Sequence, residues 1–174
     1  FLEGAFQSVR VRGAFRDYDN FFPSTQGFYG DVVGKFARPN VFVENDIVIL
    51  SPWARLSGIG GTGINVNFDE VQVGRYFEYG GSIGYYRRVL EWLTLAADFV
   101  VFQRLYAVQM NLVDGTELRR RDLMLSPGVI IILHNLIREQ ADFRIDYHYQ
   151  HNDSNDPTRP YINHLFTTAS IVRF

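Results

Sequence analysis

The chain has 174 residues, which is enough for one domain with a complete core and too few to expect two. A formal net charge of −2 implies no overall attraction to nucleic acid, and the lack of cysteine excludes disulfides, thiolate metal sites and cysteine nucleophiles. No run of 18 apolar residues occurs, which excludes an ordinary transmembrane helix, and the nearest candidate, 89–102, is interrupted by Glu91 and Asp98.

The N-terminal part predicts three strands, at 2–17, 27–37 and 46–58. A strand directs alternate side chains to opposite faces, so alternating apolar and charged residues mark a two-faced strand. Within 8–16 the two sets are Val9, Val11, Gly13 and Phe15 against Arg10, Arg12, Ala14 and Arg16. Residues 28–36 alternate likewise, with Asp31 and Lys35 on the polar side. In residues 47–57 the odd-numbered and the even-numbered positions are both apolar, so the sequence does not show which side chains of this strand share a face with the charges.

The rest of the chain predicts five more strands, at 71–88, 92–106, 119–133, 138–151 and 161–174. The clearest alternation lies in 140–150, where Ala141, Phe143, Ile145, Tyr147 and Tyr149 oppose Asp142, Arg144, Asp146 and His148. A helix would spread these charges around its circumference, so this segment is a strand. The three preceding strands place further charges on their polar sides: Glu78, Asp98, Arg104, Arg120 and Asp122. The last segment, 161–174, is strand-like, but it mixes polar and apolar residues.

The predicted connections alternate in length. Those at 89–91 and 134–137 are tight and 38–45 is somewhat longer, whereas the other four are long and polar or rich in glycine: 18–26, 59–70, 107–118 and 152–160. Short turns on one side and long loops on the other are typical of outer-membrane barrels. The sequence therefore predicts an all-β fold, a closed antiparallel up-and-down transmembrane β-barrel of about eight strands that forms one domain over 1–174.

With these strands and loops, the chain resembles the small outer-membrane barrels of the OmpA and OmpX type over its whole length. The last strand ends in Phe174, with Val172 and Phe166 at alternate positions, and resembles the signal by which such barrels are recognised for membrane insertion. The resemblance implies the bacterial outer membrane, with periplasmic termini. It also implies as partners lipid, lipopolysaccharide, the barrel-assembly machinery through the C-terminal strand, and other envelope or surface proteins through the loops.

The polar sides of the strands predict an ionic network inside the barrel. Seven cations and six anions lie on them: Arg10, Arg12, Arg16, Lys35, Arg104, Arg120 and Arg144, and Asp31, Glu78, Asp98, Asp122, Asp142 and Asp146. An eight-stranded barrel has a lumen that side chains fill, and the near balance of charge suits buried ion pairs. We therefore expect a plugged, non-conducting lumen and a structural role, presenting surface loops and anchoring or contacting a larger envelope assembly.

Other motifs give no site, so the sequence predicts no enzyme, cofactor or metal. The glycine pattern of 58–63 matches a dinucleotide-binding motif, but no helix follows it, so we interpret it as a loop. Asp146, His148, His151 and Ser154 do not assemble a hydrolase triad on one strand face. His151, Asp153, Asn155 and Asp156 are interpreted as turn formers and not as cation ligands.

Three other functions stay open. The segment 152–157 with Tyr161, Asn163 and His164 resembles the last extracellular loop of outer-membrane barrels, including larger ones fused to helical repeats in polysaccharide export. The chain is therefore also compatible with the barrel, or a fragment of the barrel, of an exporter or porin. A lipid A deacylase-like membrane enzyme and a soluble ligand-binding barrel are the remaining alternatives.

Overall fold

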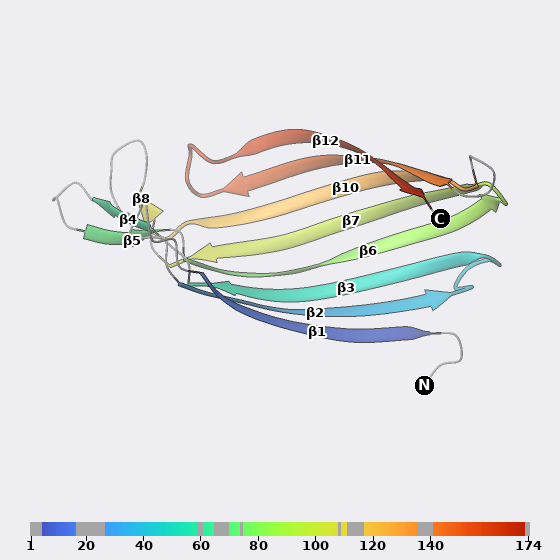
Figure 1. The fold of residues 1–174 in the computed structure, drawn as a ribbon. Coiled ribbons are helices and arrows are strands. Elements are labelled where there is room, and N and C mark those ends of the chain that lie inside the picture. Colours follow the sequence, from blue (N-terminus) through green and yellow to red (C-terminus); the bar gives the residue numbers. More distant parts are fainter. Residues whose placement is uncertain are drawn as a thin grey trace.

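The computed structural model describes residues 5–16, 27–58, 61–64, 70–73, 75–107, 109–110, 117–135 and 141–172. Eight long strands form one sheet, and each strand is hydrogen-bonded to the next long strand along the chain (Figure 1). They are β1 (Phe6–Arg16), β2 (Gly27–Pro39), β3 (Asp46–Ser57), β6 (Tyr76–Leu90), β7 (Leu93–Tyr106), β10 (Arg121–Leu133), β11 (Ala141–Ser154) and β12 (Tyr161–Val172). All seven pairings are antiparallel, so the sheet is an up-and-down meander.

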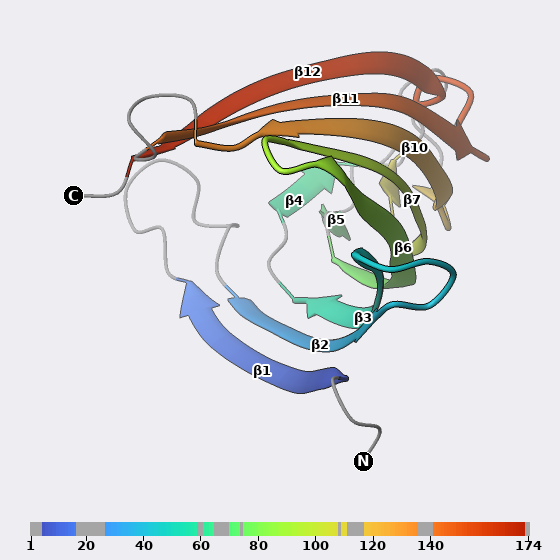
Figure 2. The same cartoon turned by 90° about the vertical axis from the view of Figure 1, so that its right-hand side faces the viewer.

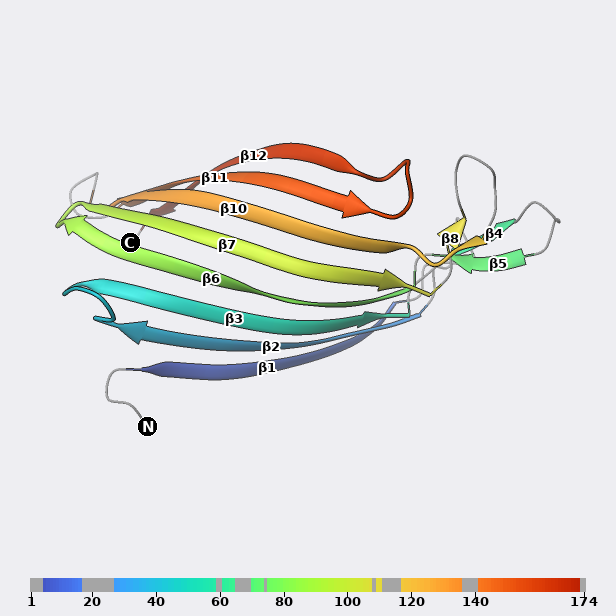
Figure 3. The same ribbon diagram turned by 180° about the vertical axis from the view of Figure 1, so that it is seen from behind.

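The connections separate into two kinds at the two ends of the sheet. β1 begins and β12 ends at the end that also carries the short β2–β3 and β6–β7 turns (Figures 1 and 3). Beyond the other end lie two small hairpins, β4 (Gly61–Ile64) with β5 (Glu70–Val73), and β8 (Gln109–Met110) with β9 (Glu117–Leu118). We call these two ends the turn end and the loop end.

The eight predicted strands and their antiparallel order are confirmed, with two local corrections. The single strand expected at 71–88 is two elements, because β5 pairs with β4 and β6 begins at Tyr76. The glycine-rich segment interpreted as a loop is partly β4, which begins at Gly61. Both corrections concern one hairpin that projects from the loop end. No helix of the described residues is long and apolar enough to cross a membrane.

The sheet curves into an open arc with one concave and one convex face (Figure 2). Residues that are paired directly across two strands lie on the same face, so the register assigns every side chain. Each of the eight strands exposes at least one large apolar side chain on the convex face, for example Val11, Val32, Leu50, Ile83, Phe99, Val129, Tyr147 and Phe166. Most of the buried strand residues lie on the concave face, where side chains converge; Ile130 and Ala96, for example, are direct partners.

The predicted closure of the barrel is not observed. Among the described residues β1 pairs with β2 alone and β12 pairs with β11 alone, so these two strands are the edges of the sheet. Figure 2 shows them at the two ends of the arc with the opening between them. Alternation of residue types determines which face each side chain occupies, but it does not determine how many strands complete the circumference.

Candidate functional site: the charge row of the concave face

Six charged side chains of alternating sign form a row across six neighbouring strands. Each is the direct cross-strand partner of the next, from β1 to β10: Arg12, Asp31, Arg55, Glu78, Arg104 and Asp122. We call this set the charge row. Its three carboxylates are buried, with Asp31, Glu78 and Asp122 only 2%, 0% and 4% exposed. Opposite charges directly across a strand pair attract, and close ion pairs join β1 to β2, β3 to β6 and β6 to β7 at this level.

Glu78 is the centre of the charge row. Its Oε1 accepts hydrogen bonds from Arg55 Nη1 at 2.9 Å and from the Trp53 indole Nε1 at 3.0 Å. Its Oε2 accepts from Arg104 Nη2 at 2.6 Å and Nε at 3.0 Å. Hydrogen bonds to a charged acceptor are among the stronger ones in proteins. The fully buried carboxylate is therefore compensated by two guanidinium groups and one neutral donor.

Aromatic rings support the arginines of the row from the sides. The Arg104 guanidinium lies 4.6 Å from the centre of the Tyr76 ring, and the Arg55 guanidinium lies 5.3 Å from the Trp53 ring. Tyr76 in turn contacts Tyr106, with 5.7 Å between the ring centres. A cation over an aromatic face is attracted by the ring quadrupole. The row thus combines paired charges with aromatic rings that contact the arginines.

The two ends of the row are held by further local contacts. On β2, Asp31 accepts from Arg12 Nε at 3.1 Å and from the Tyr29 hydroxyl at 3.1 Å. At the other end, Asp122 accepts from Arg120 Nε at 2.8 Å, and the Arg120 guanidinium lies 4.5 Å from the Tyr106 ring. The Arg12 side chain, on the edge strand β1, is 54% exposed, so the row is least covered at this edge.

A second polar cluster lies nearer the turn end on β7, β10 and β11. Arg144 Nε donates to Asp146 Oδ1 at 2.8 Å, and His148 Nδ1 lies 3.7 Å from Asp98 Oδ1. Gly128 lies between Asp98 and His148 in the register. A Cβ atom on Gly128 would collide with both of these side chains, so glycine is the residue that lets them meet.

The structure brings together many of the residues predicted for the network. The register places these on the concave face: Arg10, Arg12, Asp31, Lys35, Glu78, Asp98, Arg104, Asp122, Asp142, Arg144 and Asp146. Arg120 precedes β10 and pairs with Asp122. Arg16 ends β1, and its side chain lies outside the described residues. Among described carboxylates, none lies within ion-pair distance of Arg10 or Lys35.

The predicted insertion signal is partly described. Phe166 lies on the convex face opposite Tyr147 and is 66% exposed. Val172 is the last residue of β12 and pairs with Ala141, which places it at a convex register position. Phe174 lies outside the described residues.

Sequence reasoning missed Arg55 and Trp53, two of the residues that contact Glu78. Their strand, β3, has apolar residues at both odd-numbered and even-numbered positions, so alternation could not assign its two faces. A signal was present, because Arg55 is the one basic residue of β3. A buried strand tolerates a single cation only where a partner carboxylate is near, and the register supplies Asp31 and Glu78 on its two sides.

Of the residues considered for a hydrolase, Asp146, His148 and Ser154 occupy concave register positions on β11, but His151, the histidine nearest to Ser154 in sequence, does not. His151 pairs with Leu125 on the convex face, whereas Ser154 pairs with Asp122 on the concave face. For cation binding, no group of three or more His, Cys, Asp or Glu that could hold a metal ion occurs among the described residues. Asn155 instead donates to the Arg119 carbonyl at 3.1 Å and accepts from the Arg121 amide at 2.7 Å, joining the β11–β12 loop to β10.

Asp156 organises the β11–β12 loop. Burial raises its pKa, but hydrogen bonds from the Thr158 amide and hydroxyl, at 3.0 and 2.7 Å, and the nearby charges of Arg120 and Arg159 outweigh this effect. The pKa of Asp156 therefore lies below its ordinary value. Since the charged form is favoured in the folded protein, the loop is more stable at neutral pH than in acid.

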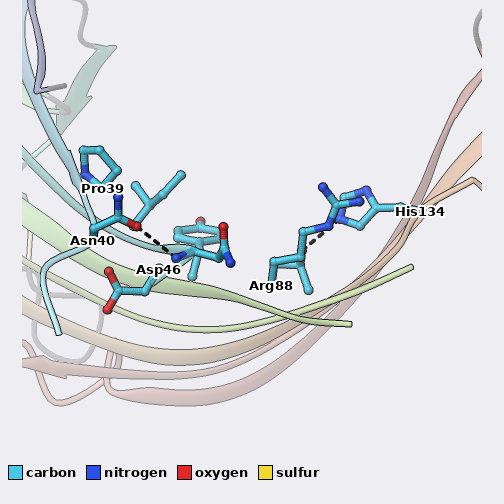
Figure 4. Close-up of a pocket in the computed structure, with 9 residues that line it drawn as sticks. Pro39, Asn40, Asp46, Arg88 and His134 are labelled. Carbon is cyan, nitrogen blue, oxygen red and sulfur yellow. Dashed lines mark hydrogen bonds between the residues drawn. The ribbon is translucent and has the colours of Figure 1, made fainter. Parts of the chain in front are cut away.

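A cavity of about 430 Å³ opens at the turn end of the concave face. Figure 4 shows Arg88 and His134 on one side of it and Pro39, Asn40 and Asp46 of the β2–β3 turn on the other. His134 Nε2 lies 2.8 Å from Thr94 Oγ1, and the Arg88 amide donates to the Asn45 carbonyl at 3.2 Å. The first of these contacts joins the residue after β10 to β7, and the second joins the β2–β3 turn to β6, so hydrogen bonds hold the rim of the cavity.

Comparisons with protein-family models, with curated proteins and with solved structures found no match. The geometry of the two faces is therefore the basis on which a function is inferred.

Proposed function

We propose that this chain forms the wall of a β-barrel in a bacterial outer membrane, with the convex face in lipid and the concave face lining a polar lumen. The observation that carries the proposal is the contrast between the faces. Every long strand exposes large apolar side chains on the convex face, while the concave face buries paired charges. Soluble proteins have the opposite arrangement, and monomers rarely expose large contiguous apolar patches.

The lengths of the strands and the positions of the polar residues support the same proposal. The shortest long strand, β1, has 11 residues, and a tilted strand needs about 9–11 to cross the hydrocarbon layer. On the convex face the basic residues lie near strand ends: Arg38 and Arg87 toward the turn end, and Arg121 at the loop end. Cations at these levels reach the lipid headgroups, whereas the centre of the band is apolar.

The role that fits this wall best is structural. The strands hold the loops at one membrane surface, where they meet lipopolysaccharide and other envelope proteins, and the edge strand β12, which carries Phe166 and Val172, is the strand that the barrel-assembly machinery would contact. The paired charges of the concave face stabilise the wall. No catalytic role is part of the proposal.

The test is a measurement of which face meets lipid. Val32 and Val33 are neighbours on β2 that face opposite sides, since Val32 pairs with Val11 and Val33 with Arg10. In a background with Trp53→Phe and Trp92→Phe, a single tryptophan is introduced as Val32→Trp or Val33→Trp. In vesicles containing lipids brominated along the acyl chain, the fluorescence of Val32→Trp should be quenched much more than that of Val33→Trp.

The matched pair differs by one position in the same strand, so unequal quenching reports facing and not depth. Equal quenching, or a chain that remains soluble without detergent or lipid, would contradict the proposal. Fractionation of cells should in addition recover the chain with the outer membrane.

A further inference from the structure

The two edges of the sheet are the feature that the proposed wall does not explain. The outer sides of β1 and β12 have no strand partner among the described residues. Within lipid, an unpaired backbone N–H or C=O has no water to bind and is strongly unfavourable, which is why strands cross membranes only in closed barrels. If the wall lies in a membrane, both edges must be paired.

The two edges are complementary to each other. The sheet has an even number of strands in up-and-down order, so β1 and β12 run in opposite directions. They have nearly equal lengths, 11 and 12 residues. Both expose apolar residues on the convex side, such as Val11 and Phe166. An antiparallel pair of β1 with β12 would therefore continue the ladder and keep the apolar face on the outside.

The edges of one sheet do not meet, because they lie at opposite ends of the arc (Figure 2). Each is also poorly covered on the concave side: the Arg12 side chain is 54% exposed, and residues 161–171 of β12 are all exposed. In a closed barrel of eight strands the side chains of such strands fill the lumen. The observed curvature thus leaves both edges available to another sheet.

We propose that a second copy of this chain closes the barrel, with β1 of each copy paired to β12 of the other. A two-fold axis along the barrel then relates two identical seams, and no edge remains. Both copies place their turn ends on the same side of the membrane. The product has 16 strands, twice the 8 of one sheet. This inference rests on the proposed membrane location.

A barrel of this size has a different interior from one of eight strands. Barrels of about 16 strands leave an aqueous channel, whereas about eight strands enclose only side chains. In the two-copy barrel the charge row lines the wall of a channel instead of filling a plug. The assembled pair should therefore conduct ions, and a single copy should not.

Cysteine cross-linking tests the seam, because the chain has no native cysteine. Val11→Cys on β1 is prepared in a chain with one affinity tag, and His164→Cys, Phe166→Cys or Thr168→Cys on the convex side of β12 in a chain with another. After the two chains fold together in vesicles, oxidation should join differently tagged chains for at least one of the three positions. The matched control replaces the β12 cysteine with Phe99→Cys on the inner strand β7, which should give no cross-linked pair.

The remaining outcomes decide between closure mechanisms. A chain carrying both Val11→Cys and Thr168→Cys that cross-links within itself at high dilution would overturn the proposal in favour of self-closure. Membrane-inserted chains that stay monomeric and uncross-linked would overturn it in favour of strands from another source. A chain that does not enter vesicles overturns the proposed function as well. In planar bilayers, the cross-linked pair should open steady channels that the monomeric fraction lacks.

Discussion

At the scale of single residues, Glu78 receives hydrogen bonds from three side chains at once while its own side chain is fully buried. Glu78→Gln keeps the shape but removes the charge that balances Arg55 and Arg104. Removing one partner of a buried ion pair typically costs about 3–5 kcal/mol, because the remaining charge is left uncompensated. We expect the free energy of unfolding in urea, measured in lipid vesicles, to fall by about that amount.

Glu91→Gln provides the control for Glu78→Gln, because the change is chemically the same and Glu91 is exposed in the β6–β7 turn. Surface substitutions usually change stability by no more than about 0.5 kcal/mol. If both variants unfolded at the same urea concentration, the charge row would contribute nothing specific to stability.

At the scale of elements, the β2–β3 turn depends on the carboxylate of Asp46. Asp46 is buried and accepts the backbone amides of Val41, Phe42 and Val43 at 2.7, 2.9 and 3.0 Å. Asp46→Ala removes all three acceptor contacts, and a hydrogen bond to a charged group contributes about 1.5–3 kcal/mol, but Val41, Phe42 and Val43 are exposed, so water can replace part of what is lost. We expect a loss of stability in this range in the same urea assay, and slower pairing of β2 with β3.

Glu44→Ala in the same turn is the matched control, since Glu44 is exposed. A loss as large for Glu44→Ala as for Asp46→Ala would show that the turn tolerates no substitution, and that the carboxylate of Asp46 has no special role.

The strands with strict alternation could be predicted from sequence, and so could many of the charges that lie on the concave face. In 140–150, for example, Arg144 and Asp146 share a parity, and the structure pairs them at 2.8 Å. β3 could not be assigned because both of its faces are apolar, and the partner of Glu78 on that strand, Arg55, was therefore missed. The split of 71–88 into β5 and β6 depends on pairing with β4, a contact that alternation within one segment does not encode.

At the scale of the whole molecule, the proposed membrane location predicts that a new charge costs more stability on the convex face than on the concave face. Ile83→Arg places a cation on the convex face of β6, where Ile83 is 50% exposed and opposite Phe99. A cation at the membrane midplane costs about 2–4 kcal/mol. We expect a stability loss of this size in vesicles.

Ser82→Arg tests the other face at the neighbouring position, since Ser82 faces the concave side opposite Val100. In a lumen open to water this cation stays hydrated, so the loss should be clearly smaller than for Ile83→Arg. A larger loss for Ser82→Arg would place water on the convex face and contradict the proposed location. The number of strands in the proposed barrel is the part of the architecture that the residue pattern of neither face encodes.

The meander order of the sheet has a consequence for the path of folding. Every long strand pairs with the next long strand along the chain, so each of the seven pairings needs only a loop of modest length to close. Contacts between neighbours in sequence form early, and contacts between distant segments form late. In the proposed two-copy barrel, the pairing of β1 with β12 joins two chains, so it needs an encounter between copies and forms last. Zippering of hairpins therefore precedes the seam, and until the seam forms, both strand edges can recruit strands from other chains. Rapid transfer to lipid should therefore raise the yield of refolding, whereas dilution should lower the yield of the closed pair, because its seams join two copies.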